Sequence, residues 1–417
     1  MRFWNKAFPV SITAMTVFAA LAIPVRLATQ GKNQQPPNYT VTDLGTLGGT
    51  FGQANAVSNS GSVVGAANLP GDTESHAFLW SKGVKSDLGT LGGPNSGAMS
   101  LNERGEVVGT ADTSTPDPLG EDLCVNGNLI CLPFLWRDGR MVPLPTLGGN
   151  NGFGIGINSR GQVAGDVENT TPDPTCPSPS VQLELRPVIW EKGEIEQELP
   201  TIGGDPDGFV FAINDNGQAV GITGDCIGPH HTVLWNNGTP TDLGTPGGLL
   251  LFPADINNRG QIVGQAVSSD GTVEVAFLWQ NGVLTELGTL PPDVISLAMG
   301  INDKGQIVGQ SCDQDFDCRA FLWQDGTMTE LNTLVHDPNA PFLENANSIN
   351  SRGQIVGTTD LPDAYLATPS PGEATDEAAA PAATRQRQRV ASPEIRRMLR
   401  QRLGPRYHIP GLEVPRN

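Results

Sequence analysis

The chain has 417 residues and a formal net charge of −19, with 25 basic and 44 acidic residues. An acidic surface argues against nucleic acid as a partner and permits cation binding, although acidity also serves simply to keep an exported protein in solution. Glycine (51 residues) and proline (34 residues) form about a fifth of the chain, which is typical of a fold rich in turns. The length is enough for one large or two ordinary domains.

Residues 1–37 have the features of an export leader. They contain four basic residues and no acidic one, and Arg2 and Lys6 precede an apolar run with a small-residue site at 20–22. This order predicts a secretory signal peptide, with an uncleaved membrane anchor as the alternative. No later stretch is apolar for long enough to span a bilayer. We therefore expect a secreted, periplasmic or cell-surface protein with no membrane span after removal of the signal.

From residue 38 onward, the heptad DLGTLGG recurs along the chain. It stands at 43–49 and again at 87–93, a spacing of 44 residues. Five related segments follow, namely PLPTLGG (143–149), ELPTIGG (198–204), DLGTPGG (242–248), ELGTLPP (286–292) and ELNTLVH (330–336). Such a period indicates a repeat architecture and has to be considered before any other pattern.

Each repeat contains two hairpin signals. In the sixth repeat, AMGIN (298–302) precedes GQIVG (305–309), and AFLW (320–323) precedes an Asp-Gly pair and the strand leading to the next heptad. Asn-x-x-Gly and Asx-Gly between apolar runs predict tight turns, because Asn bonds its own backbone and Gly adopts positive φ. The turn glycine is present in all seven repeats, at Gly61, Gly105, Gly161, Gly217, Gly260, Gly305 and Gly353. The turn asparagine is present in six, at Asn102, Asn158, Asn214, Asn257, Asn302 and Asn350, with Ser58 in the first.

Four short strands per repeat predict an all-β fold, a seven-bladed β-propeller of four-stranded antiparallel blades over residues 38–368. We expect the heptad to form the outer strand, and its Gly-Gly to let the chain turn back where a side chain would collide. The pattern begins with a lone outer strand at 38–47 and ends with three strands within 348–367. The N-terminal strand is therefore expected to complete the last blade and close the ring.

Six tryptophans occupy one repeat position, at Trp80, Trp136, Trp190, Trp235, Trp279 and Trp323. One aromatic side chain per blade at a fixed place favours packing between blades over a sugar-stacking stripe. Ala367 takes this position in the last repeat, so weaker local packing is expected there.

These motifs resemble the repeats of the HAF family, predicted extracellular repeat proteins of bacteria. The resemblance rests on DLGTLGG, the IN-x-x-GQ-V-x-G hairpin and AFLW-x-x-G, and covers residues 38–368. It implies export and a propeller-like β fold, and it brings no biochemical activity or catalytic residues. The chain departs from the pattern at Pro291-Pro292 and Val335-His336, where Gly-Gly is missing, and at Ala367.

If the inner strand comes first in each blade, the loops from the second to the third strand and the heptad connections open on one face. The longest of these loops are 110–132 and 166–186, in adjacent repeats, which makes this face the candidate for binding. All six cysteines lie in such loops, and an exported chain is expected to form disulfides. The blade arrangement selects the pairs Cys124–Cys131, Cys176–Cys226 and Cys312–Cys318. A zinc site is the alternative, although no C-x-x-C spacing occurs.

Acidic residues and two histidines gather in the same loops. The candidate ligand-binding residues are Asp112, Asp117, Glu121, Asp122, Asp166, Asp173, Asp205, Asp207, Asp225, His230 and His231. Their oxygens would suit Ca²⁺, the one cofactor considered, with ordinary solvated turns as the alternative because no EF-hand run occurs. The two histidines lie beside a carboxylate and would suit acid–base work, with an inert exposed pair as the alternative. No established catalytic motif is present.

The repeat pattern stops before residue 369. Residues 369–385 have the composition of a flexible linker, and 386–417 form a basic tail in which Ser392 and Gly404 would bound a short helix. A disordered extension is the alternative for this tail.

The sequence as a whole predicts a non-catalytic binding or interaction module that uses the long-loop face for an extracellular glycan or protein ligand. The alternatives are a polysaccharide-active enzyme that uses the loop carboxylates, and a purely structural cell-surface protein.

Overall fold

The computed structural model describes residues 36–121, 123, 128–176, 181–226, 230–268 and 274–370. The chain divides into two compact units, Met1–Gln35 and Pro36–Asn417, and all described residues belong to the second. The predicted signal peptide, the linker and tail from residue 371 onward, Asp122 and Cys124 lie outside the described residues. Within the described part, no helix has the length and apolar character needed to cross a membrane.

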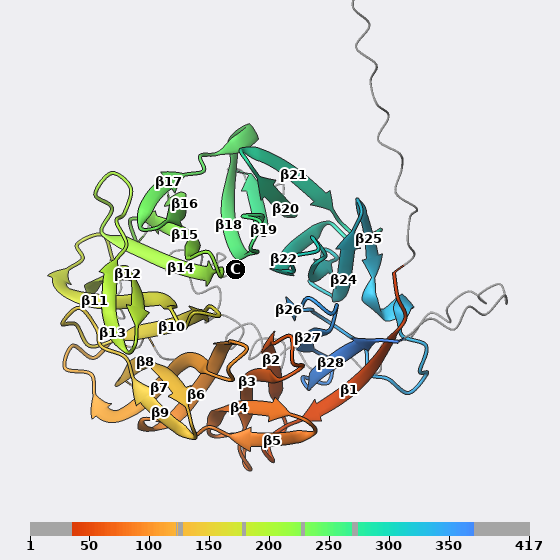
Figure 1. Ribbon diagram of the computed structural model, residues 1–417, viewed down its shortest axis with the longest axis horizontal. Helices are drawn as coiled ribbons and strands as arrows, with labels where there is room; N and C mark the ends of the chain where they lie inside the picture. Colours follow the sequence, from red (N-terminus) through yellow and green to blue (C-terminus); the bar gives the residue numbers. More distant parts are fainter. Residues whose placement is uncertain are drawn as a thin grey trace, which may run out of the picture. The chain divides into compact units, whose positions relative to one another are not determined.

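The described residues of the second unit are almost entirely strands and loops, and the strands form groups of four (Figure 1). The first three groups are β2 (Gly52–Val57), β3 (Val63–Asn68), β4 (Ser75–Ser81) and β5 (Val84–Asp87); β6 (Gly92–Leu101), β7 (Val107–Pro116), β8 (Leu129–Arg137) and β9 (Arg140–Pro143); and β10 (Gly152–Ile157), β11 (Val163–Pro172), β12 (Leu183–Glu191) and β13 (Glu194–Glu198). The next three are β14 (Asp207–Ile213), β15 (Gln218–Gly224), β16 (His230–Asn236) and β17 (Thr239–Asp242); β18 (Leu249–Ile256), β19 (Ile262–Ser268), β20 (Glu274–Gln280) and β21 (Val283–Gly288); and β22 (Ile295–Ile301), β23 (Ile307–Cys312), β24 (Cys318–Gln324) and β25 (Thr327–Glu330). The last contains β26 (Ser348–Ile349), β27 (Ile355–Thr358), β28 (Ala364–Pro369) and β1 (Tyr39–Gly45).

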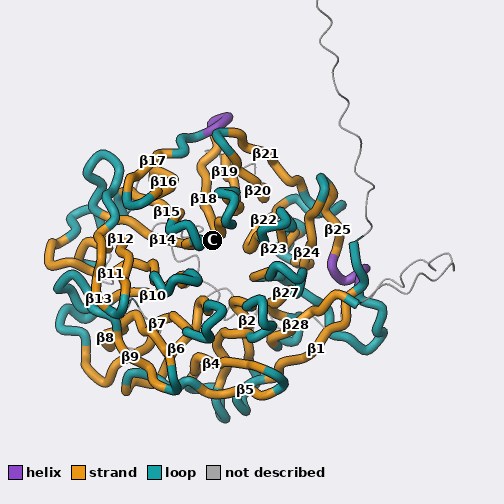
Figure 2. Tube along the Cα trace, in the orientation of Figure 1, coloured by secondary structure: helices purple, strands orange, loops and turns teal. Residues whose placement is uncertain are grey.

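Two short 3-10 helices, η1 (Pro246–Gly248) and η2 (Leu331–Leu334), are the helical elements of the described residues (Figure 2). A single parallel pairing, Glu274 with Ile295, joins the group that begins with β18 to the group that begins with β22. Neighbouring strands within each group are antiparallel, so every group is a short meander of the kind expected from the two hairpin signals.

Strand β1 comes first in the chain and pairs with the last strand. It runs antiparallel to β28, from Tyr39 opposite Pro369 to Gly45 opposite Ala364. The first strand of each group contacts the first strand of the next group, and β26 contacts β2 in the same way. This succession of four-stranded sheets, each with its first strand nearest the centre in Figure 1, is propeller-like.

The heptad is a turn held by its own side chains. Asp43 Oδ1 accepts the N–H two residues further on at 2.7 Å, while Thr46 Oγ1 accepts the Gly48 N–H at 3.1 Å and donates to the Gly49 carbonyl at 2.8 Å. Gly48 has a φ of 107°, and a Cβ on Gly49 would lie 2.6 Å from the Leu69 carbonyl oxygen. The predicted need for Gly-Gly is therefore confirmed in this copy.

The position of the outer strand differs from the prediction. In five of the seven groups the fourth strand ends at the first residue of the heptad, as β5 does at Asp87, whereas β1 and β21 continue to its third residue, Gly45 and Gly288. In the copies that begin at Asp43 and Asp87, the aspartate accepts the N–H two residues further on, and the backbone leaves the strand within these three residues.

The turn asparagines join neighbouring sheets. Asn257 Oδ1 accepts the N–H groups of Arg259 at 3.0 Å and Gln261 at 3.1 Å, which fixes the hairpin turn. Its Nδ2 donates to the backbone carbonyl of Asn302, in the next sheet, at 3.0 Å. The same link runs from Asn102 to Asn158, from Asn158 to Asn214, from Asn214 to Asn257, from Asn302 to Asn350 and from Asn350 to Ser58. One side chain thus closes its own turn and fastens the adjacent sheet.

The apolar core is divided into clusters that lie between adjacent sheets. One cluster joins Val108 of β7 to Val163 and Trp190 of the following sheet. Trp190 and Trp235 are fully buried, and each donates its Nε1–H to a proline carbonyl, at 2.9 and 2.8 Å. Packing between sheets is confirmed as the role of these two tryptophans. Ala367, which replaces tryptophan in the last repeat, is itself fully buried in such a cluster.

Candidate binding face

We call the loop face the side that carries the connections from the second to the third strand of each sheet and the segments that follow the heptads. Its two longest connections lie in neighbouring sheets, as predicted, and run from β7 to β8 and from β11 to β12. Both predicted loops are partly strand, since β7 extends to Pro116 and β11 to Pro172. Each connection then begins with an aspartate in a T-P-D-P segment, Asp117 or Asp173.

Asn151 binds two carboxylates of this face, and a third, that of Glu121, lies near them. Asn151 Nδ2 donates to Asp117 Oδ2 at 2.8 Å, and Glu168 Oε2 accepts the Asn151 backbone N–H at 2.9 Å. Glu121 Oε1 accepts the N–H of Gln182, which belongs to the neighbouring loop. Asp117, Glu121 and Glu168 are all buried, and no donor among the described residues reaches Glu121 Oε2.

Glu121 and Glu168 are buried near each other, which makes it unfavourable for both carboxyl groups to be ionised at once. Burial raises the pKa of Glu121 to about 7, and the charges of Glu168 and Asp117 act in the same direction. Burial also raises the pKa of Glu168, against the hydrogen bonds that it accepts from residues 150 and 151. The charge of each carboxyl group opposes ionisation of the other, so one of the two keeps a proton near neutral pH.

Replacing Glu121 by glutamine is expected to stabilise the protein above neutral pH. The native state keeps the Glu121 proton up to a pH of about 7, whereas the unfolded chain loses it near the ordinary value of 4.5, so wild-type stability falls as the pH rises between these values. The glutamine amide can donate to Glu168 at any pH. We expect the variant to gain about 1–3 kcal/mol at pH 8 and almost nothing at pH 4.5, measured by urea denaturation. The exposed Glu194→Gln is the control, and equal pH profiles for both variants would contradict the shared proton.

The next sheet repeats this arrangement with one exchange. Asp207 stands where the preceding repeat has Asn151, and its Oδ1 accepts the Leu185 N–H at 2.9 Å just as Asn151 Oδ1 accepts the Cys131 N–H at 3.0 Å. Asn151 donates to Asp117, whereas Asp207 faces Asp173 with a carboxyl group. Burial raises the pKa of Asp207 to about 8, and the charge of Asp173 adds to this effect.

Three further predicted residues act as hydrogen-bond acceptors within the fold. The contacts are Asp112 with Asn95 Nδ2 at 2.9 Å, Asp166 with the Val210 N–H at 2.8 Å and Asp205 with Thr223 Oγ1 at 2.6 Å. Asp112 and Asp166 are buried, and burial raises the pKa of Asp166 to about 8. Asp225 is exposed. The structure therefore gathers the predicted acids at the second to fourth sheets, with most of them beneath the surface.

The two predicted histidines are placed differently from each other. His231 Nδ1 lies 2.8 Å from Asp242, the first residue of a heptad. The same contact between a basic third-strand residue and the heptad acid occurs in the pairs His76–Asp87, Arg186–Glu198 and Arg319–Glu330. Its recurrence in four sheets favours a structural role for His231. His230 packs its ring 4.5 Å from that of Phe252, and burial lowers its pKa. Neither histidine hydrogen-bonds Asp225, although all three residues are described.

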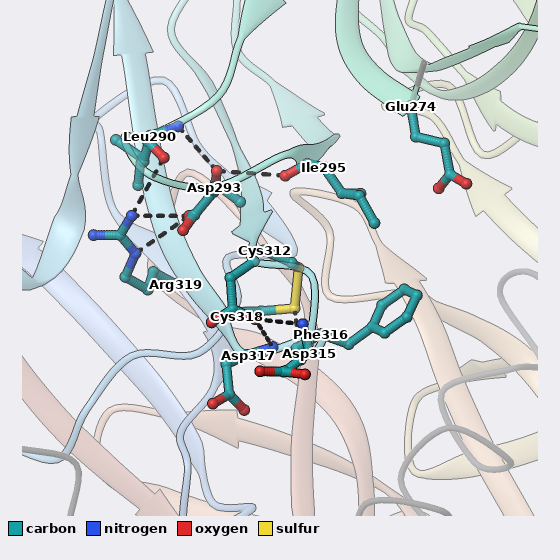
Figure 3. Close-up of a disulfide and its surroundings, with 12 residues drawn as sticks. Glu274, Leu290, Asp293, Ile295, Cys312, Asp315, Phe316, Asp317, Cys318 and Arg319 are labelled. Atoms are coloured by element: carbon teal, nitrogen blue, oxygen red, sulfur yellow. Dashed lines mark hydrogen bonds and ion pairs between the residues drawn. A yellow bond between two sulfur atoms is a disulfide. The ribbon is translucent and has the colours of Figure 1, made fainter. Parts of the chain in front are cut away.

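Two of the predicted disulfides are confirmed. Cys176–Cys226 ties the loop after β11 to the loop after β15 in the next sheet, and Cys312–Cys318 closes the connection between β23 and β24 (Figure 3). Cys131 is disulfide-bonded, and its expected partner lies outside the described residues.

The loop closed by Cys312–Cys318 presents an aromatic side chain that sequence reasoning missed. Phe316 is 52% exposed and has a φ of 60°, a conformation that bulky residues seldom adopt. Its loop is held by the disulfide and by Asp313 Oδ1, which accepts the N–H groups of Asp315 and Asp317 at 2.9 Å. Figure 3 shows the ring directed away from the disulfide. A single phenylalanine within CDQDFDC gives no periodic signal, so only the disulfide pairing of its neighbours could have indicated it.

A pocket of about 220 Å³ opens on the opposite side, which carries the hairpin turns and which we call the turn face. It lies between the third and fourth sheets, and its lining includes the polar residues Arg160 and Gln197 and the apolar residues Ala219 and Trp235. Ala219 explains the space, because the same repeat position holds valine or isoleucine elsewhere, at Val63, Val107, Val163, Ile262, Ile307 and Ile355. None of the predicted binding residues that the structure describes lines it.

No protein-family model matches the chain, and neither does any curated protein. Among solved structures, it is similar to the oligogalacturonate lyase from Vibrio parahaemolyticus, with 12% identity, 79% of this chain and 97% of the other covered, and a TM-score of 0.49. It is similar to a catalytically inactive virginiamycin B lyase from Staphylococcus aureus, with 12% identity, 79% and 99% covered, and a TM-score of 0.46. It is also similar to the β-propeller domain of the Trilobed protease from Pyrococcus furiosus, with 11% identity, 67% and 81% covered, and a TM-score of 0.45. The chain spans about half of a matching puromycin hydrolase, 47% of its length. At such identities these proteins carry nothing about the ligand or activity of this chain.

Proposed function

We propose that the chain is an exported, non-catalytic binding module of the HAF repeat type, a closed seven-bladed propeller whose loop face holds an extracellular protein or peptide. The seven heptads, the pairing of β1 with β28 and the contact of β26 with β2 support seven blades and ring closure. The basic and apolar leader in residues 1–37 supports export.

Phe316 is the observation that carries the binding role. An exposed aromatic side chain on a loop fixed by a disulfide and by two Asp313 hydrogen bonds loses little conformational freedom on binding. Aromatic anchors of this kind dominate the energy of protein interfaces. The left-handed backbone at Phe316 is strained, and strain of this kind gathers at functional sites.

Further apolar side chains are exposed on the same face. Leu119 lies in the connection after β7, Val294 in the segment before β22, and Leu361 in the connection between β27 and β28. Their exposed fractions are 42%, 46% and 51%. Exposed apolar side chains among acidic loops suit a partner with apolar and basic side chains better than they suit a neutral glycan.

The carboxyl pairs of this face favour binding over glycoside hydrolysis. A glycosidase needs two carboxyl groups that reach the substrate from either side, roughly 5–10 Å apart. Glu121 with Glu168 and Asp173 with Asp207 are in mutual contact instead, and all four residues are at most 5% exposed. Their geometry stabilises the loops rather than offering an acid and a base to a polymer.

The test is a parallel screen of the mature full-length chain against displayed peptides and a glycan array. We expect peptide ligands, and we expect Phe316→Ala to weaken their binding about tenfold or more, which corresponds to at least about 1.4 kcal/mol. Val283→Ala is the matched control, because Val283 is 64% exposed on the outer strand β21. Ligands found only among glycans, or peptide binding that Phe316→Ala leaves unchanged, would overturn the proposal.

A further inference from the structure

The Cys176–Cys226 disulfide lies against the carboxyl groups of Asp173 and Asp207. One donor atom from each of the four residues, two sulfurs and two carboxylate oxygens, lies within 4.8 Å of all the others. Asp173 and Cys176 lie in one loop, Cys226 lies in a second loop, and Asp207 lies at a strand end. The two loops are also joined by a hydrogen bond of 3.0 Å from the Cys226 N–H to Thr175 Oγ1. The cluster is therefore set by the fold and does not depend on the disulfide alone.

Each carboxyl group is oriented through one of its oxygens. Asp173 Oδ1 accepts the N–H and the hydroxyl of Thr175, at 2.8 and 2.7 Å, and Asp207 Oδ1 accepts the Leu185 N–H at 2.9 Å. Asp173 is 5% exposed, and no donor among the described residues reaches its Oδ2. A buried carboxylate oxygen without a donor is costly in a protein interior unless a cation or a proton neutralises it.

We propose that reduction of the Cys176–Cys226 disulfide turns this cluster into a Zn²⁺ site with Asp173, Cys176, Asp207 and Cys226 as its four ligands. A dithiol reductant supplies two electrons and two protons, the S–S bond breaks, and each sulfur becomes a thiol while the reductant is oxidised to its own disulfide. Binding of Zn²⁺ then releases both thiol protons, and the sulfurs coordinate as thiolates.

The donor set selects the class of metal. Two thiolates and two carboxylate oxygens suit a four-coordinate tetrahedral ion such as Zn²⁺, whereas Ca²⁺ takes six to eight oxygens and avoids sulfur. Zinc bonds of about 2.0–2.3 Å place neighbouring ligand atoms about 3.3–3.8 Å apart. Ligand atoms that already lie within 4.8 Å of one another need only small shifts once the sulfurs separate.

Neither the equivalent place in the preceding repeat nor the other disulfide has the same set of donor atoms. The preceding repeat has Asn151 at the position of Asp207, and this amide satisfies Asp117 by a direct hydrogen bond. The disulfide Cys312–Cys318 has acidic neighbours, but Asp293 is paired with Arg319 at 2.9 Å (Figure 3). Asp313 Oδ1 accepts two backbone N–H groups. Among the described residues, four donors converge only at Cys176–Cys226.

The experiment uses the mature chain with Cys124, Cys131, Cys312 and Cys318 replaced by serine, so that one disulfide remains. The chain is titrated with Co²⁺ under nitrogen, with and without a phosphine reductant, and Zn²⁺ is added in competition. After reduction we expect one Co²⁺ per chain with a thiolate-to-cobalt absorption band that Zn²⁺ abolishes. Without reductant we expect no such band.

Asp207→Asn is the matched variant, because Asn151 shows that this fold accepts an amide at the equivalent place. In the oxidised form we expect it to melt at or above the temperature of its parent, because the amide can donate to Asp173 at any pH, and after reduction we expect it to bind Co²⁺ at least tenfold more weakly. A missing thiolate band, or an affinity that Asp207→Asn leaves unchanged, would overturn the proposal. Should reduction unfold the chain, Zn²⁺ present during reduction must preserve the native circular-dichroism spectrum, and failure to do so would also overturn it.

Discussion

Replacing Gly309 by alanine is expected to lower the free energy of unfolding by about 3 kcal/mol or more. Gly309 lies on β23 opposite a bulge in β22, where the register shifts between Ala298 and Gly300. An added Cβ would overlap the Leu297 carbonyl oxygen and lie 2.9 Å from Phe321 Cζ. Since the obstacle is backbone, the two strands must separate to admit the methyl group.

The matched control is Gly97→Ala, in a strand of the same fold. A Cβ on Gly97 would meet only Ala66 Cβ, at 3.9 Å, so a change within about 0.5 kcal/mol is expected. Urea denaturation of both variants measures the difference. Equal midpoints would mean that the bulge adjusts at little cost and that steric contact does not explain the glycine.

The same geometry explains why this glycine recurs in every repeat. None of the seven second-strand glycines has room for a Cβ, because a backbone carbonyl oxygen of the preceding segment lies too close, at Gly65, Gly109, Gly165, Gly221, Gly264, Gly309 and Gly357. The sequence pattern could reveal that a glycine is required, because glycine alone tolerates such approach. It could not reveal the bulge, which depends on where the partner strand lies.

The strands and their order followed from local signals. Asx-Gly turns such as Asn281-Gly282 have positive φ at both residues, 50° and 81°, as the dipeptide predicts. The heptad was harder to interpret, because its apolar residues resemble a strand while Asp43 and Thr46 bond the backbone two residues further on. Side-chain bonds of this kind compete with the strand ladder, and composition alone does not show which one prevails.

The candidate face was only partly predictable. Sequence reasoning placed Asp117, Asp173 and Asp207 on the correct side of the fold, since loop length and order along the chain determine this. It could not show that they are buried, or that Asn151 and Glu168 complete their surroundings. These contacts cross between repeats, and a pattern read within one repeat contains no information about its neighbour.

Replacing Asn257 by alanine is expected to cost about 3 kcal/mol, the second large effect. The change removes the bonds from Asn257 Oδ1 to the N–H groups of Arg259 and Gln261, and the bonds from Nδ2 to Gln261 Oε1 and to the Asn302 carbonyl. Asn257 is buried, so the groups left behind lose their partners where water is largely excluded. Thermal and urea unfolding of the full chain measure the loss.

Asn257→Asp separates the two roles of this side chain. The carboxylate keeps both acceptor bonds of the turn but cannot donate to Asn302, and it sets a negative charge beside that carbonyl. We expect at least half of the alanine effect to remain if the link between sheets matters. The first repeat offers a natural comparison with Asn257, because its turn has Ser58 in place of asparagine and so lacks an amide donor toward the next sheet. Ser58→Asn should add a bond to the Asn102 carbonyl and raise stability by about 1 kcal/mol. A destabilised Ser58→Asn, together with a neutral Asn257→Asp, would show that asparagine serves its own turn and that the links between sheets contribute little.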